Sequence, residues 1–211
     1  MAINPSIINF ETEVLSRCGL SYLNLDWCEF GNQKWSDRSV AKYKYEDLGV
    51  KHTSIDVNGL DGSWQFNLNI PLPSNLYGRF DVVTNYGTLE HVLYQYSGFY
   101  NMHKICKLSG IVIHSLPVIG KHGEHGFYHY SNKFMFDLYQ ALDYTHIHSK
   151  VFCSNNGFES LLISFQKKQD EFISKSEFDK YFEFCSVTSI EKICENMKLK
   201  KYKNIQNTFE K

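Results

Sequence analysis

Apolar residues along this chain occur in two patterns: short runs bounded by turn residues, and longer stretches with apolar positions every three or four residues. The first pattern is typical of strands and the second of amphipathic helices. Strands are predicted at residues 22–30, 52–57, 80–85 and 111–116, and helices within residues 1–20 and at 36–48, 93–108 and 132–142. Residues 107–110, Lys-Leu-Ser-Gly, are predicted to end the third helix. Strands and helices that alternate in this order predict a mostly parallel sheet with helices on both faces.

Two further strand-like runs, residues 147–153 and 160–165, follow the alternating part of the chain. Residues 155–157, Asn-Asn-Gly, separate them, and Asn-Gly tolerates the positive φ angles of a tight turn, so an antiparallel hairpin is predicted. Beyond this hairpin the chain is charged and shows helical spacing of its apolar residues, at Ile190, Ile193, Cys194 and Met197. We therefore expect one domain at residues 1–167 and a helical appendage at 168–211.

The composition is that of a globular protein with little net charge. The 211 residues include 43% hydrophobic residues, enough for a core, and the formal net charge is −1. A chain without a strong positive field does not attract nucleic acid, so no nucleic-acid partner is expected. The basic patch Lys198–Lys203 is interpreted as a solvated helix end, with a nucleic-acid contact as the alternative.

Cysteine spacing and the N-terminal segment indicate the compartment. The six cysteines show no C-x-x-C spacing, which favours buried free thiols in a reducing cytosol over disulfides or a metal site. The N-terminus lacks a basic region followed by a long apolar run, and no stretch approaches the ~18 apolar residues that span a membrane. We expect a cytoplasmic protein with no membrane contact, and the sequence assigns no oligomeric state.

The most informative segment runs from Phe80 to Val92 and reads FDVVTNYGTLEHV. An acidic residue opens a short apolar run, which ends in Asn-Tyr-Gly and is followed by Glu-His. In open α/β sheets, ligands bind in the crevice at the carboxyl ends of the strands. The segment resembles the fourth strand of class I S-adenosylmethionine-dependent methyltransferases, and the resemblance covers residues 20–167. It implies a Rossmann-like seven-stranded methyltransferase sheet, α/β in class, and S-adenosyl-L-methionine as the cofactor.

The resemblance implies cofactor contacts directly after the first strand, at Glu29, Phe30, Gly31 and Asn32. Glu29 stands where an acidic residue of the family helps to fix the methionine amino end of the cofactor. Gly31 stands where the backbone approaches the cofactor without a Cβ in the way. Gln33 and Trp35 occupy positions where the family has further glycines, so the methionine pocket departs from the family pattern.

Further cofactor contacts are implied along the next strands, at Asp56, Val57, Asn67, Leu68, Asn85, Tyr86 and Gly87. Asp56 stands where an acidic residue accepts hydrogen bonds from both ribose hydroxyls, with turn capping as the alternative. Asn67 stands where the family contacts the adenine amino group, and an ordinary loop asparagine is the other interpretation. Residues 85–87 are expected to line the sulfonium region, where an aromatic face favours the cation.

Two methylation chemistries are disfavoured by the residues after the fourth strand. Methyl transfer requires that donor and acceptor are aligned and, where needed, that a proton is removed. The turn Asn85–Thr88 lacks the Asn/Asp-Pro-Pro-aromatic sequence of amino methyltransferases that act on adenine or cytosine, and the chain contains no Pro-Cys, the nucleophile of cytosine carbon methyltransferases. An oxygen or nitrogen atom of a small-molecule or sugar-type acceptor remains.

Histidines are the candidate bases, since imidazole titrates near neutrality. His91 follows the fourth strand, and His125 and His129 lie in the glycine-framed loop Gly120–Tyr130. We expect this loop to form the acceptor side of the pocket, facing Tyr86 and His91, with an ordinary packed loop as the alternative. A metal site is a third interpretation, with His122, Glu124, His125 and His129 as ligands. That spacing matches no zinc pattern, and no metal is assigned.

Three functions compete for this sequence. The resemblance favours a methyltransferase. The reduced glycine loop favours a non-catalytic member of the fold that serves as a scaffold or partner subunit. A dinucleotide-dependent oxidoreductase is disfavoured, because the first loop lacks G-x-G-x-x-G and the predicted C-terminal hairpin is atypical of that class.

Overall fold

The computed structural model describes residues 3–123, 125–154, 157–182 and 186–187. The predicted helix around Ile190 and the basic patch lie outside the described residues. The helices are α1 Pro5–Arg17, α2 Ala41–Asp47, α3 Gln95–Ile105, α4 Asn132–Ala141 and α5 Lys175–Phe182. The strands are β1 Asp26–Phe30, β2 Lys51–Asp56, β3 Trp64–Gln65, β4 Phe80–Tyr86, β5 Cys106–Pro117, β6 Tyr128–His129, β7 Tyr144–Cys153, β8 Glu159–Lys167 and β9 Ser186–Val187.

Seven strands form one sheet in the order β3-β2-β1-β4-β5-β8-β7. The pairs from β3 to β5 are parallel, whereas β8 is antiparallel to both β5 and β7. The mostly parallel sheet and its C-terminal hairpin are therefore confirmed. The strand order reverses between β1 and β4, and in open α/β sheets this is the point at which ligands bind.

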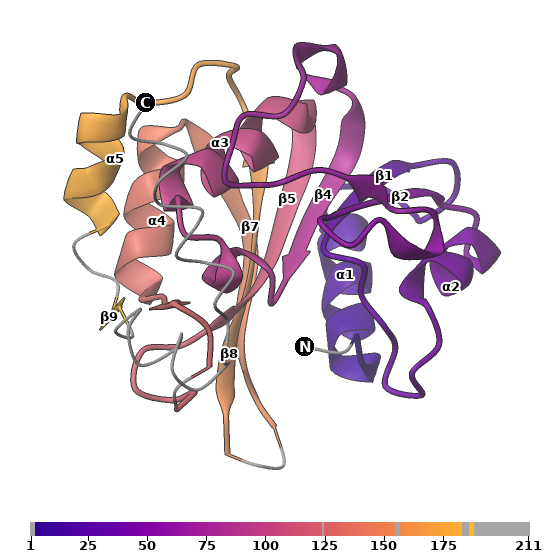
Figure 1. Ribbon diagram of the computed structural model, residues 1–211. Helices are drawn as coiled ribbons and strands as arrows, with labels where there is room; N and C mark the ends of the chain where they lie inside the picture. The colour runs from indigo at the N-terminus through magenta and orange to yellow at the C-terminus, as the bar shows by residue number, and fades with distance from the viewer. Residues whose placement is uncertain (1–2, 124, 155–156, 183–185, 188–211) are drawn as a thin grey trace.

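Both faces of the sheet are covered by helices because successive apolar residues of a strand point to opposite sides. Val82 of β4 packs with α1 and α2, whereas Val83 packs with α3, α4 and α5. The same alternation divides Leu161 from Leu162 in β8. Figure 1 shows the resulting three layers, with α1 and α2 on one side of the sheet and α3 to α5 on the other.

The predicted helix end at residues 107–110 is wrong, because α3 ends at Ile105 and these residues belong to β5. The register between β4 and β5 shifts there, and Ser109 has a φ of 65°. The Lys107 ammonium lies 2.8 Å from Asp81 Oδ1 and 3.1 Å from Asp26 Oδ2, at the starts of β4 and β1. These carboxylates are distant in sequence, so local periodicity could not reveal them.

Other element boundaries shift by a few residues. β1 begins at Asp26 rather than at residue 22, α2 begins at Ala41 rather than at 36, and β3 was not predicted. Phe178 of α5, within the predicted appendage, is buried in the same cluster as α3 and α4. Among the described residues, no helix is both long and apolar enough to cross a bilayer. The four cysteines in the described part of the chain are free thiols.

Candidate active site

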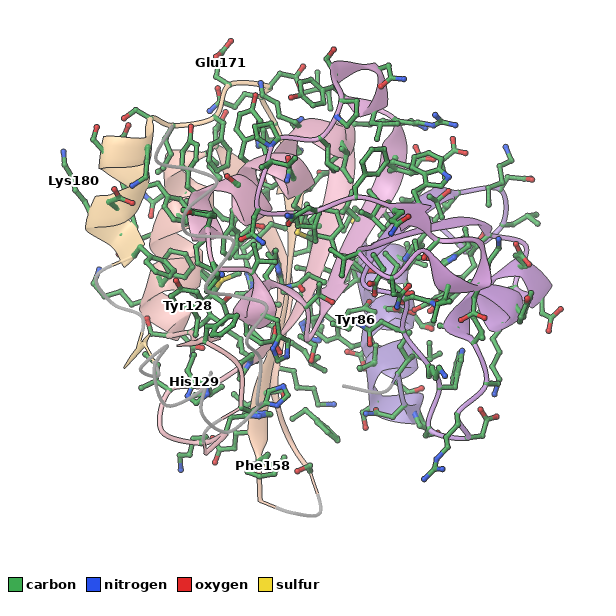
Figure 2. All side chains as sticks on the ribbon, in the orientation of Figure 1. Tyr86, Tyr128, His129, Phe158, Glu171 and Lys180 are labelled. Atoms are coloured by element: carbon green, nitrogen blue, oxygen red, sulfur yellow. The ribbon has the colours of Figure 1, made fainter. Side chains whose placement is uncertain are left out.

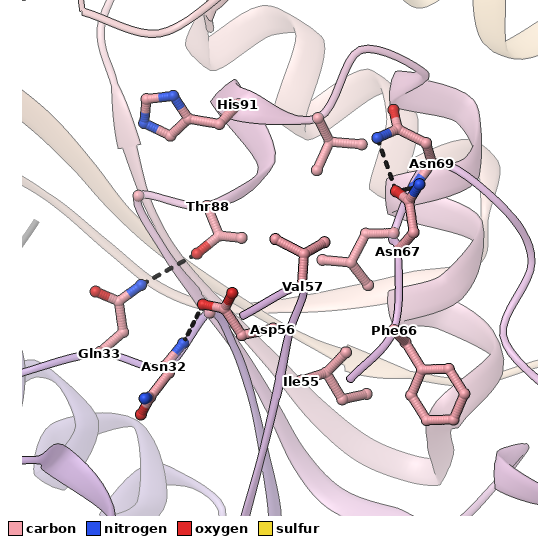
Figure 3. A pocket seen from close by; sticks show the side chains of 14 residues that line it. Asn32, Gln33, Ile55, Asp56, Val57, Phe66, Asn67, Asn69, Thr88 and His91 are labelled. Carbon is pink, nitrogen blue, oxygen red and sulfur yellow. Dashed lines mark hydrogen bonds between the residues drawn. The ribbon is translucent and has the colours of Figure 1, made fainter. Parts of the chain in front are cut away.

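A cavity of about 300 Å³ opens at the carboxyl ends of β1, β2 and β4 (Figure 3). Its position is the point where the strand order reverses, and its size is at the lower end of the range for small-molecule sites. The sequence-predicted cofactor contacts that line it are Gly31, Asn32, Asp56, Val57, Asn67, Leu68 and Gly87. The fold therefore brings together residues from four separate segments, which lie at or just after the ends of β1, β2, β3 and β4, at one edge of the sheet.

The Asp56 carboxylate lies at the end of β2 and faces this cavity (Figure 3). Its Oδ2 accepts a hydrogen bond of 2.8 Å from the backbone N–H of Asn32, and its Oδ1 accepts one of 2.9 Å from that of Asn58. The second bond is the turn-capping contact of the alternative interpretation. A carboxylate has about four lone-pair sites, so each oxygen keeps capacity for one further donor. Turn capping and ribose binding are therefore compatible at this residue.

Gly31 has a φ of +87°, a conformation that residues with a Cβ rarely adopt. A Cβ on Gly31 would lie 2.4 Å from Thr88 Oγ1 and 2.6 Å from Gln33 Nε2. These two side chains are hydrogen-bonded to each other at 3.1 Å, and Thr88 Oγ1 donates to the Phe30 carbonyl at 2.7 Å. The space freed by this glycine is thus occupied by protein atoms, whereas the sequence interpretation reserved it for the cofactor.

The wall beside Asp56 carries apolar side chains next to a pair of asparagines. Ile55, Val57 and Leu68 supply apolar surface against which a flat ring can pack. The side-chain oxygen of Asn67, Oδ1, accepts two hydrogen bonds from Asn69: one of 3.0 Å from the Asn69 backbone nitrogen and one of 2.9 Å from the Asn69 side-chain nitrogen. Both lone pairs of that oxygen are used, so the expected bond from an adenine amino group to Asn67 requires Asn69 to move.

The turn after β4 is held by a buried network beneath the cavity. Asn85 Oδ1 accepts the backbone N–H groups of Thr88 and Leu89 at 3.1 and 2.9 Å. Its amide nitrogen therefore faces His114 Nδ1 at 3.3 Å, so the other ring nitrogen of His114 donates to the Tyr139 hydroxyl. Burial lowers the pKa of His114 to about 3, which keeps the ring neutral. Asn85 positions cavity residues instead of lining the cavity itself.

Tyr86 does not face the cavity, contrary to expectation. Its ring is buried against α1, and its hydroxyl donates to Glu11 Oε1, which also accepts from Tyr45 at 2.6 Å. Tyr22 donates to Glu11 Oε2 at 2.9 Å. The alternation of β4 explains this placement, since Tyr86 shares the face of Val82.

Glu29 and Phe30 are also buried outside the cavity. Glu29 Oε2 lies 3.6 Å from His52 Nε2 and accepts the Gln33 backbone N–H at 3.3 Å. Burial raises the pKa of Glu29, while His52 opposes this rise. The carboxylate is thus directed to the protein interior and not to the expected methionine amino group.

His91 lines the cavity. The described residues of the loop Gly120–Tyr130, called the histidine loop below, do not line the cavity themselves, but the loop contacts His91 through His125. The rings of His91 and His125 meet edge to face, with centroids 4.9 Å apart. The backbone N–H of Phe127 donates to the Glu90 carbonyl at 2.7 Å, which fastens the loop to the turn after β4. Burial lowers the pKa of His91, and His125 adds to this effect while Glu90 opposes it.

His129 is not brought to the cavity. It is buried, and its Nε2 donates to the His125 carbonyl at 2.9 Å. Figure 2 shows it near Tyr128 and well separated from Tyr86, so the loop does not face that tyrosine. His129 thus supports the loop, whereas His125 is the loop histidine that contacts His91.

Sequence reasoning missed several residues of the cavity: Gln33, Ile55, Phe66, Asn69, Thr88 and Val92. Each of them is directly adjacent in sequence to a predicted residue, but adjacency alone does not show which side chains reach the cavity. Gln33 and Asn69 lie on loops, where no strand or helix periodicity indicates which way a side chain points.

Comparisons with known proteins identify the fold. No family model matches the sequence, and no curated protein matches it. The solved structures that resemble it include the 1,6-didemethyltoxoflavin-N1-methyltransferase of Burkholderia thailandensis, with bound 1,6-didemethyltoxoflavin and S-adenosylhomocysteine. It has a TM-score of 0.59 and 13% identity, over 76% of this chain and 77% of that one.

Two further structures show how the fold is used elsewhere. The N-methyltransferase NodS of Bradyrhizobium japonicum, in complex with S-adenosylhomocysteine, has a TM-score of 0.53 and 14% identity over 79% of this chain and 89% of its own. The [4+2]-cyclase SpnF has a TM-score of 0.54 and 12% identity over 74% of this chain and 79% of its own. This chain therefore has the fold of class I S-adenosylmethionine-dependent methyltransferases, as the resemblance predicted.

Proposed function

We propose that the protein is an S-adenosyl-L-methionine-dependent methyltransferase that acts on an oxygen or nitrogen atom of a small-molecule or sugar-type acceptor. One observation carries the proposal: in this fold, the cavity at the ends of β1, β2 and β4 presents Asp56 beside an apolar wall. S-adenosylhomocysteine in the two methyltransferase neighbours supports it.

The residues of the cavity fit the cofactor's nucleoside. Asp56 retains acceptor capacity for two ribose hydroxyls, and hydrogen bonds to a charged group are worth about 1.5–3 kcal/mol. Ile55, Val57 and Leu68 would pack against the adenine ring. When bound, the cofactor supplies an electrophilic methyl group.

The acceptor side is assigned to His91, which lines the cavity, and to His125, which contacts the His91 ring. The lowered pKa of His91 keeps its imidazole neutral at physiological pH, so it can accept a proton from an acceptor hydroxyl or amine. His125 packs edge to face on His91 and limits the orientations that its ring can adopt. In this proposal the cofactor binds at Asp56, and the methyl acceptor binds beside His91 and His125.

A non-catalytic or differently catalytic member of the fold is the second candidate. The hydrogen-bonded side chains of Gln33 and Thr88 occupy the space next to Gly31. Asn69 donates two hydrogen bonds to the side-chain oxygen of Asn67 and so uses both of its lone pairs. SpnF, named as a cyclase, is an example of this fold with another named reaction. This candidate predicts a pocket with weak or absent cofactor affinity.

Calorimetric titration separates these candidates. The full chain is titrated with S-adenosylhomocysteine and, separately, with NAD. Saturable one-to-one binding of S-adenosylhomocysteine without NAD binding is expected. Binding of neither compound would favour the non-catalytic candidate, and binding of NAD alone would favour the oxidoreductase.

A further inference from the structure

Glu90 is a fully buried carboxylate in the helical turn Leu89–His91. Neither of its oxygens has a hydrogen-bond partner among the described residues. Its ion-pair contact in that part of the chain is with His125, whose Nε2 lies 3.7 Å from Oε1. A buried, uncompensated carboxylate costs several kcal/mol. Among the described residues, His125 is the group placed to neutralise the Glu90 carboxylate, and a bound cation would supply further stabilisation.

Two imidazoles lie beside this carboxylate. One ligand atom from each of Glu90, His91 and His125 can be chosen so that all three lie within 4.8 Å of one another. Metal–ligand bonds of about 2.0–2.2 Å place two ligands of one ion roughly 3–4 Å apart. Both histidines lie at the surface, although protein partly covers His91, so rotation of their rings can close the remaining distance while the buried Glu90 stays fixed.

The backbone fixes this arrangement from both sides. The Phe127 N–H donates to the Glu90 carbonyl, and a Cβ on Gly126 would lie 2.8 Å from Glu90 Cγ. Gly126 has a φ of +74°, so a glycine is needed for the histidine loop to approach the carboxylate so closely. The loop after β5 and the turn after β4 thus meet at one point.

The neighbouring histidines are already engaged. His122 Nε2 is bonded to Ser160 Oγ at 3.1 Å, and His129 Nε2 is bonded to the His125 carbonyl. Glu124, a member of the ligand set suggested by the loop sequence, lies outside the described residues. The structure thus favours His125 with Glu90 and His91 over a set drawn from the loop alone.

We propose that Glu90, His91 and His125 bind one divalent first-row transition-metal ion at the rim of the cavity. Two imidazoles and one carboxylate suit such ions, whereas Mg²⁺ and Ca²⁺ prefer oxygen ligands throughout. Three protein ligands leave coordination positions for an acceptor oxygen, whose pKa the ion would lower. With the ion bound, this activation would replace the proton transfer to His91, which belongs to the metal-free protein. Only this last role rests on the proposed methyltransferase function, because the binding of the ion does not require it.

The test is a titration of the chelator-treated full chain with Co²⁺, followed by its visible absorption. One Co²⁺ per chain is expected for the wild type. Glu90→Gln, His91→Ala and His125→Ala should each weaken binding by at least about tenfold. His146→Ala, which removes an exposed imidazole of β7, is the matched control and should bind Co²⁺ like the wild type. Equal affinity in all four variants, or no one-to-one complex, would overturn the proposal.

Measurement of the Tm shows whether the variants are folded. Without metal, Glu90→Gln replaces a buried carboxyl group that has no hydrogen-bond partner among the described residues with an uncharged amide of the same shape, so its Tm should equal or exceed that of the wild type. Co²⁺ should raise the Tm of the wild type and leave that of Glu90→Gln unchanged, because only a folded site that binds the ion is stabilised by it. An equal rise in both proteins would count against the site.

A parallel titration with S-adenosylhomocysteine keeps the two proposals apart. The metal-free protein should bind it as well as the Co²⁺-loaded protein does, because Asp56 lies outside the proposed ligand set. Co²⁺ binding without S-adenosylhomocysteine binding would leave the metal site standing and overturn the methyltransferase proposal. The reverse result would overturn the metal site alone.

Discussion

The backbone N–H of Asn32 donates a 2.8 Å hydrogen bond to the carboxylate of Asp56. This bond joins the loop after β1 to the end of β2, and both residues line the cavity. The bond fixes the orientation of the Asp56 carboxylate through a rigid backbone group. Such support suits a residue that presents its remaining lone pairs to a ligand.

Replacement of Asp56 tests the assignment of the ribose site. Asp56→Ala should weaken S-adenosylhomocysteine binding by at least about 1.5–3 kcal/mol, the value of one hydrogen bond to a charged group, because the ribose hydroxyls lose their acceptor. Asp61→Ala is the matched control: this nearby carboxylate accepts from the Asn32 side chain at 2.7 Å but does not line the cavity. Calorimetry that finds the same loss for both variants would place the ribose elsewhere.

Gly31→Ala should destabilise the protein more than Gly19→Ala does. Both glycines have positive φ angles, which cost a residue with a Cβ about 1–2 kcal/mol. Gly19 has open space around its Cβ position, whereas Gly31 faces Thr88 and Gln33 at less than 3 Å. Urea denaturation measures the difference, and equal losses would mean that the two side chains move aside without cost.

Asn85→Ala should lower the free energy of unfolding by about 2–3 kcal/mol, because the backbone N–H groups of Thr88 and Leu89 lose their shared acceptor. Thr84→Val is the control on the same strand, since the buried Thr84 hydroxyl has no hydrogen-bond partner among the described residues. The control should be neutral or stabilising. A stable Asn85→Ala protein with unchanged ligand affinity would refute the supporting role of Asn85.

The free energy of unfolding should decrease as the pH rises from the ordinary pKa of Glu11 to its raised pKa in the folded protein. Burial raises the pKa of Glu11 to about 7, although the hydroxyls of Tyr45, Tyr86 and Tyr22 oppose this rise. Its ordinary pKa is 4.5, so between these values the folded carboxyl binds a proton that the unfolded one does not. The free energy of unfolding therefore decreases as the pH increases across this window, by up to about 3 kcal/mol.

Urea denaturation at about pH 5 and about pH 8 checks this decrease. Glu11→Gln should flatten the dependence, because the glutamine does not titrate. Glu46→Gln removes an exposed carboxylate of α2 and should keep the wild-type slope. A slope that is identical in the two variants would exclude Glu11 as its source.

Much of the fold was predictable because strands such as β4 are short apolar runs that end at a turn residue, and because a clear turn sequence follows β2. Asp56 was predictable for the same reason, since the end of β2 must lie at the ligand-binding edge. Tyr86 was placed wrongly, although the period of two along β4 assigns it to the face of Val82. The Gln33–Thr88 and Asn67–Asn69 hydrogen bonds were beyond prediction, because they depend on the conformations of loop side chains.

The most direct test of the central claim is a crystal structure of the full chain with S-adenosylhomocysteine. We predict the ribose hydroxyls on the Asp56 carboxylate, the adenine against Leu68, and the sulfur end of the ligand toward His91. Gln33 or Asn69 should change rotamer to admit the ligand. A ligand bound away from the ends of β1, β2 and β4, or a cavity that stays empty at saturating ligand with the Gln33–Thr88 and Asn67–Asn69 bonds both intact, would contradict the prediction.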